Sequence, residues 1–147
     1  DNDIGIQLDA GATADISGSK FLSNSGPGIF AVNATPNTTT SATISDTDIM
    51  GVVTTDNFGI FARADVALAT ARIEIIRSVI SNTETGVGAQ SQNGTASVSI
   101  RKSMVTGSSA CGLSQVFPGS TLITYGNNTL SDNGLNFCGT LTSSAPL

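Results

Sequence analysis

Residues 73–87, with the sequence IEIIRSVISNTETGV, contain the pattern that decides the fold. Ile73 and Ile75 lie two positions apart, which is the spacing of a strand that buries one face. Ile80 follows Ile75 by five positions, a step too long for continued alternation on one face, and the small polar residue Ser78 lies between them. The pattern therefore predicts a short strand, a corner and a second short strand.

The same pattern recurs along the chain. Each repeat begins with a glycine followed by an aliphatic residue, at Gly5, Gly28, Gly59, Gly86 and Gly112, with a weaker start at Gly139. Each repeat also contains two apolar residues five positions apart: Ile16 and Phe21, Ile44 and Ile49, Ile75 and Ile80, Ile100 and Val105, Tyr125 and Leu130. A third apolar residue precedes each pair by two positions: Ala14, Ala42, Ile73, Val98 and Ile123. The predicted corners are occupied by Ser19, Thr47, Ser78, Ser103 and Asn128.

One repeat cannot bury its apolar residues alone, whereas stacked repeats place like residues over like residues about 4.8 Å apart. We therefore predict an all-β fold, a right-handed parallel β-helix, or solenoid, of about five coils. The solenoid covers residues 1–139, and residues 140–147 form a C-terminal tail. An antiparallel β-sandwich is the alternative, but a sandwich does not keep a column-by-column register.

The composition limits the classes of function. The net charge is −5, and the six basic residues are scattered, which speaks against a nucleic-acid partner. No run of 18 apolar residues is present, so no membrane span is expected. The chain opens without methionine, and we expect a processed protein or a fragment.

The two cysteines test the predicted register. Cys111 directly precedes Gly112 and Cys138 directly precedes Gly139, so the register stacks one cysteine above the other. A disulfide bond is favoured over two buried free thiols, because neighbouring strands hold their Cα atoms within disulfide range. Such a bond indicates an oxidising compartment, in a secreted or cell-surface protein, extracellular or periplasmic. Two cysteines without histidine offer too few ligands for a metal, and no cofactor is expected.

The coils resemble those of right-handed parallel β-helix repeat proteins, the pectate-lyase-like superfamily. The closing segment 124–134, TYGNNTLSDNG, resembles the last coil of secreted bacterial β-helix proteins of unassigned function. Those proteins usually carry further coils before this segment. The resemblance therefore implies that this chain corresponds to their C-terminal half.

The superfamily includes pectate lyases, polygalacturonases and many proteins that are not enzymes. Hydrolysis in that group implies clustered aspartates and a histidine, but this chain has no histidine, and its closest carboxylates are Asp46 and Asp48. Stacking the coils gives the column Gly18, Asp46, Arg77, Lys102 and Asn127. Asp46 beside Arg77 is the only opposite-charge neighbour pair in that column, and we interpret it as a modest structural contact. No catalytic residue is assigned.

Two features are candidates for a ligand surface. Phe30 and Phe61 occupy one outward column and would give a small exposed apolar strip, unless nearby loops cover it. Residues 33–40, NATPNTTT, read as a loop protruding from the longest repeat, and this loop contains Asn33 and Asn37.

Three functions remain as hypotheses. The first is a secreted structural or adhesive module that assembles end to end into a filament, since a solenoid exposes unpaired strand edges at both ends. The second is a carbohydrate-binding module that uses the phenylalanine strip or the 33–40 loop. The third is the remnant of a polysaccharide lyase or hydrolase. The expected partner is accordingly another copy of the chain or a polysaccharide.

Overall fold

The computed structural model describes residues 2–144, which contain strands β1 to β17 and no helix. The strands form three sheets in which every neighbouring pair is parallel. Sheet 1 contains β1 (Ile6–Leu8), β4 (Ile29–Asn33), β7 (Phe58–Ala64), β10 (Thr85–Ser91), β13 (Cys111–Val116) and β16 (Leu135–Cys138). Sheet 2 contains β2 (Thr13–Ser17), β5 (Thr39–Ser45), β8 (Thr70–Ile76), β11 (Thr95–Arg101), β14 (Ser120–Tyr125) and β17 (Thr142–Ser144). Sheet 3 contains β3 (Lys20–Leu22), β6 (Asp48–Met50), β9 (Val79–Ser81), β12 (Met104–Thr106) and β15 (Thr129–Ser131).

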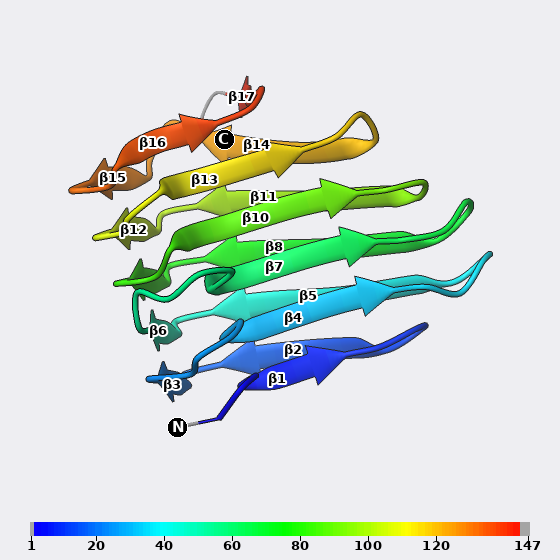
Figure 1. Cartoon of the computed structure of the whole chain (residues 1–147), viewed down its shortest axis with the longest axis horizontal. Helices are drawn as coiled ribbons and strands as arrows, with labels where there is room; N and C mark the ends of the chain where they lie inside the picture. The colour runs from blue at the N-terminus through cyan, green and yellow to red at the C-terminus, as the bar shows by residue number, and fades with distance from the viewer. Residues whose placement is uncertain (1, 145–147) are drawn as a thin grey trace.

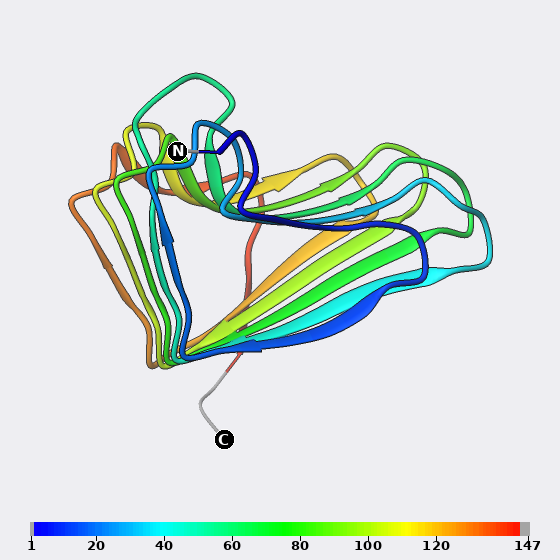
Figure 2. The same cartoon turned by 90° about the horizontal axis from the view of Figure 1, so that it is seen from below.

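The strands follow one another around a solenoid of about five coils. Each coil runs along sheet 1 in front, returns along sheet 2 behind it and closes through sheet 3, and the next coil lies above it on a right-handed path (Figure 1). Figure 2 shows the stack end on, with the strands of each sheet lying over one another around a three-sided outline. The predicted all-β parallel solenoid is confirmed. Within the described part of the chain, no helix has the length and hydrophobicity needed to cross a membrane.

The predicted apolar columns form the core of the middle coils. Ile75 pairs with Ile44 below it and Ile100 above it, and all three side chains are fully buried. Ile73 pairs with Ala42 and Val98 in the neighbouring inward column. Since alternate residues of a strand face opposite sides of a sheet, the residues between these columns point to the outer face of sheet 2.

The corner between sheets 2 and 3 is held by a polar corner ladder, which consists of the predicted residues Ser19, Thr47, Ser78, Ser103 and Asn128. Ser78 shows the repeating arrangement. Its Oγ accepts a hydrogen bond from the backbone N–H of Thr47 at 3.2 Å and donates to the carbonyl of Ile76 at 3.0 Å. Its own N–H donates to Ser103 Oγ at 3.1 Å. The ladder therefore satisfies backbone groups that the corner removes from the sheets.

The last coil differs from the predicted register. Cys111 pairs with Leu135 and Cys138 pairs with Ser114, so the cysteines do not share one column. Thr85 and its partner Cys111 are 26 residues apart in the sequence, but Cys111 and its partner Leu135 are only 24 apart. Because the last coil is shorter, Cys138 lies over Ser114 and not over Cys111. A disulfide nevertheless joins Cys111 to Cys138, with the Cα atoms 6.0 Å apart.

The segment 140–147 was expected to be a tail. Its residues Thr142–Ser144 form β17, which pairs with β14 as the last strand of sheet 2. Residues 145–147 of this segment lie outside the described part of the chain.

Candidate ligand-binding site

A cavity of about 210 Å³ lies where β8, β11 and β14 end at the polar corner. It is lined by residues from three successive coils: Ile76, Arg77, Arg101, Lys102, Tyr125 and Asn127. Arg101 pairs with Ile76 at the end of sheet 2, and Arg77 and Lys102 follow these two residues at the corner. The cavity walls therefore come from two adjacent columns of the solenoid, which the strand pairing and the polar corner ladder hold in place.

The corner residues of the cavity adopt a conformation that most side chains avoid. The residue before each of the first four ladder members has a positive φ, which is 47° at Arg77 and 51° at Lys102. A left-handed residue turns the chain sharply enough to separate two short strands. Glycine avoids the strain of this conformation, yet only the first corner carries one, at Gly18.

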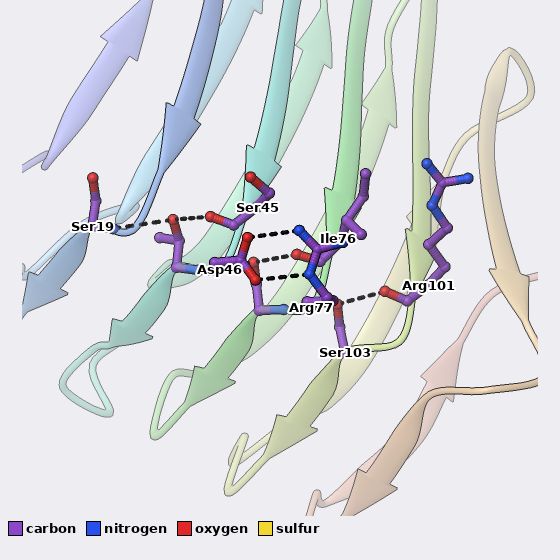
Figure 3. Close-up of polar contacts among 9 residues, drawn as sticks. Ser19, Ser45, Asp46, Ile76, Arg77, Arg101 and Ser103 are labelled. Atoms are coloured by element: carbon purple, nitrogen blue, oxygen red, sulfur yellow. Dashed lines mark hydrogen bonds and ion pairs between the residues drawn. The ribbon is translucent and has the colours of Figure 1, made fainter.

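Two of the three cations at the cavity are paired with carboxylates. Arg77 donates from Nε and Nη2 to the two carboxylate oxygens of Asp46, at 2.8 and 2.7 Å (Figure 3). Arg101 Nη2 lies 2.7 Å from Glu74 Oε1. Lys102 forms no salt bridge within residues 2–144. Three cations thus face two carboxylates, and the cavity carries one unit of excess positive charge.

The contact between Asp46 and Arg77 changes the acidity of both groups. Hydrogen bonding from Arg77 lowers the pKa of Asp46, although slight desolvation opposes it, and the same hydrogen bond raises the pKa of Arg77. Because the pKa of Asp46 is lowered in the folded protein, the pair is fully formed above the usual aspartate pKa and is lost as the pH falls through the lowered value.

We therefore expect the carboxyl carbon of Asp46 to titrate in NMR spectra with a midpoint below the usual aspartate value. Replacing Arg77 with glutamine should return the midpoint toward that value, because the bidentate charged partner is removed. The same replacement at Arg63, which pairs with Asp65, should leave Asp46 unaffected. An Asp46 midpoint that is identical in the wild type and in Arg77→Gln would contradict this account.

A second hollow, of about 270 Å³, adjoins the cavity on the outer face of sheet 2. It is lined by Arg72, Ile73, Glu74, Ser97, Val98, Ser99, Ile123 and Tyr125. Tyr125 lines both hollows, and together they form what we call the sheet 2 groove. The groove combines one aromatic ring with serine hydroxyls and charged side chains on rigid strands.

The phenylalanine column is partly covered and does not form the apolar strip that it would give if exposed. Phe30 and Phe61 do pair across neighbouring coils. However, Phe61 is only 6% exposed and Phe30 is half-buried, because Phe58 stacks on the ring of Phe61. The ring centroids are 4.1 Å apart for Phe58 and Phe61 and 5.3 Å apart for Phe30 and Phe61. The next residue in the column is Gly88, and a Cβ there would meet the Phe58 ring at 2.7 Å, so the stack leans over this glycine.

The two candidate asparagines have different environments. Asn33 is fully buried, and its amide nitrogen donates to the carbonyls of Thr38 and Thr70 at 2.9 and 2.8 Å. Its side-chain oxygen accepts from the N–H of Thr35 at 3.0 Å, so Asn33 holds the loop and is not part of a ligand surface. Asn37 is exposed at the turn of the same loop, where its φ is 60°.

The sequence pattern does not predict that Tyr125 lines the groove. The pattern predicts that Ile123 and Tyr125 lie in the inward columns, but Val98 pairs with Leu122 and Ile100 pairs with Thr124. Tyr125 consequently faces outward and lines the groove. Leu122 and Ile123 are both aliphatic, so the apolar pattern alone does not distinguish the two registers. Within residues 2–144, no group of three or more histidine, cysteine, aspartate or glutamate side chains is arranged to hold a metal ion.

Comparisons with protein-family models, curated proteins and solved structures found no match to this chain. The fold is a parallel β-solenoid, and the resemblance to the pectate-lyase-like superfamily stays an interpretation of the sequence.

Proposed function

We propose that this chain is a secreted polysaccharide-binding module and that the sheet 2 groove is the place where the polymer lies. The observation that carries the proposal is the convergence of Tyr125, Arg101 and Asn127 on one cavity. Sugar rings offer an apolar face for an aromatic side chain and a rim of hydroxyls for polar groups. The cavity provides both kinds of contact in adjacent columns.

The scaffold suits this role because the groove is built on strands. Binding groups on paired strands are held more precisely than groups on loops, and little order has to be imposed when a ligand binds. Ser97 and Ser99 extend the polar surface beyond Tyr125, so more than one sugar unit has contacts available. The disulfide between Cys111 and Cys138 supports an oxidising, extracytoplasmic location.

Polysaccharide binding is the second of the three hypotheses, the carbohydrate-binding module, but at the sheet 2 groove and not at the phenylalanine column or the 33–40 loop. Asp46 is one of the two carboxylates that pair with the cavity cations, and both of its oxygens accept hydrogen bonds from Arg77. End-to-end assembly into filaments stays a prediction. Electron microscopy of the purified protein tests it, and only monodisperse particles at high concentration would contradict it.

The proposal predicts that Tyr125→Ala weakens the binding of soluble polysaccharides at least about tenfold, which corresponds to about 1.4 kcal/mol. The loss follows from removing the only aromatic ring that lines the groove in the described part of the chain. Affinity electrophoresis against a panel of neutral and acidic polysaccharides would identify a binder, and isothermal titration would give its dissociation constant.

Phe117→Ala provides the matched control. Phe117 is 54% exposed and precedes β14, whereas Tyr125 ends the same strand, so the two variants remove aromatic rings at opposite ends of one element. We expect Phe117→Ala to bind like the wild type. An equal loss in both variants, or no binding of any polysaccharide by the wild type, would overturn the proposed function.

A further inference from the structure

We propose that the polymer bound in the sheet 2 groove is acidic and that Arg101, Lys102 and Asn127 form the subsite for its anionic group. This inference rests on the proposed function and deepens it, because it specifies the chemical class of the ligand. The anionic group is a carboxylate or a sulfate on the sugar, since both present the same acceptor oxygens and the same negative charge.

The first observation is that the basic residues of this acidic chain gather at the groove. The chain has a net charge of −5 and only six lysine and arginine residues. Four of the six line the groove: Arg72, Arg77, Arg101 and Lys102. A local concentration of cations on an acidic molecule attracts anions to that place and repels them elsewhere.

The second observation is which of these cations are paired with a carboxylate. The carboxylates of Asp46 and Glu74 pair with Arg77 and Arg101. Lys102 in the cavity and Arg72 in the adjoining hollow have no ion-pair partner in residues 2–144. Lys102 is exposed, and its side chain lines the cavity. An ammonium group without a local carboxylate is the group best able to bind an anion from solution.

The neighbours of Lys102 supply directed hydrogen bonds. Glu74 contacts Arg101 Nη2, which orients the guanidinium and leaves its other N–H groups as donors, because arginine has five. The side-chain oxygen of Asn127 accepts the backbone N–H of Lys102 at 2.9 Å. This bond fixes the orientation of the amide and leaves its NH₂ group as a donor at the cavity. The three side chains thus offer donors from two coils to one acceptor group.

The number of charges in the cavity also determines how strongly polymer binding should depend on salt. The cavity holds three of the four groove cations and these face two carboxylates, so the subsite neutralises about one anionic group. Binding should therefore weaken with added salt, because an exposed ion pair is screened. We expect a several-fold loss of affinity when NaCl is raised from about 0.05 to 0.5 M. Neutral polymers should show no such dependence.

The test compares one polyuronate with the same polymer after chemical reduction of its carboxyl groups. Isothermal titration of the full chain should show about tenfold weaker binding of the reduced polymer. Lys102→Met, which removes the charge and keeps the length of the side chain, should weaken binding of the acid form about fivefold and leave the reduced form unaffected. Lys20→Met is the matched control, because Lys20 is an exposed lysine on sheet 3 whose nearest carboxylate, that of Asp48, lies 3.6 Å away.

The outcomes separate this inference from the proposed function. Equal binding of both polymer forms, still lost in Tyr125→Ala, would overturn the acidic subsite and leave the polysaccharide-binding function standing. Absence of binding to every polymer would overturn both. Dextran sulfate distinguishes the source of the charge. If dextran sulfate binds in a manner that depends on Lys102 and the polyuronate does not bind, the subsite is assigned to sulfate. If the polyuronate binds in this manner and dextran sulfate does not bind, the subsite is assigned to carboxylate. Unchanged thermal unfolding of Lys102→Met would show that the fold is intact.

Discussion

Replacing Cys111 and Cys138 together with serine is expected to lower the free energy of unfolding by about 3–4 kcal/mol. The bond joins residues separated by 27 positions, and closing a loop of that length removes chain entropy from the unfolded state. The folded coil cannot replace the bond with burial, because β16 is poorly covered. Leu135 and Phe137 in this strand are 60% and 46% exposed. The last coil therefore depends on the crosslink more than the inner coils would.

Urea denaturation of the oxidised wild type and of the double serine variant measures this effect. Reduced wild-type protein should unfold at the same urea concentration as the variant, because both lack only the crosslink. Ser114→Ala, which alters the residue paired with Cys138, is the control and should change the midpoint little. Native-state hydrogen exchange should show the loss of protection mainly in β13 and β16. A variant as stable as the oxidised wild type would contradict the predicted role of the bond.

The architecture could be predicted from the sequence because a few local patterns determine it. Each inner coil places isoleucine, valine or alanine at the inward positions and a small polar residue at the corner, as at Ile75 and Ser78. Those residues recur at nearly constant intervals, and stacking converts sequence intervals into contacts. The polar corner ladder follows for the same reason, since each hydroxyl lies over the next backbone N–H.

The register of the last coil could not be predicted in the same way. Leu122 and Ile123 are adjacent aliphatic residues, and choosing between them changes which neighbours face outward. The spacing from Ile100 to Thr124 is 24 residues, whereas that from Ser103 to Asn128 is 25, so an additional residue lies between Tyr125 and the corner. This single insertion turns Tyr125 to the groove and completes the candidate site.

Packing that the alternation of apolar residues does not reveal accounts for the other differences. Phe58 follows a long loop, and nothing in its local sequence shows that its ring stacks on Phe61. Asn33 is buried because Thr70, from the next coil, provides a carbonyl for its amide. In both cases the pattern predicts the position of a residue in its column, and contacts that the pattern does not show decide its exposure.

Gly86→Ala is expected to lower the free energy of unfolding by about 3 kcal/mol. The cause is a steric clash of the added methyl group, and not the backbone conformation at this position. A Cβ at this position would collide with Cγ1 of Val105 in the core and lie 2.6 Å from the carbonyl oxygen of Gly112. The glycines that begin the coils therefore allow sheet 1 to approach the side chains of sheet 3. Moving the valine relieves only one of the two contacts, because the carbonyl belongs to the paired backbone of the next coil.

Gly11→Ala separates this steric effect from backbone strain. Gly11 has a φ of +79°, but no atom lies within 4 Å of a Cβ built there. Alanine at this position should cost only about 1–2 kcal/mol, from the left-handed conformation alone. In the double variant Gly86→Ala, Val105→Ala, stability should stay below that of Val105→Ala, since the contact with the Gly112 carbonyl persists. Equal costs for Gly86→Ala and Gly11→Ala in urea denaturation would show that the glycine column does not set the spacing between the sheets.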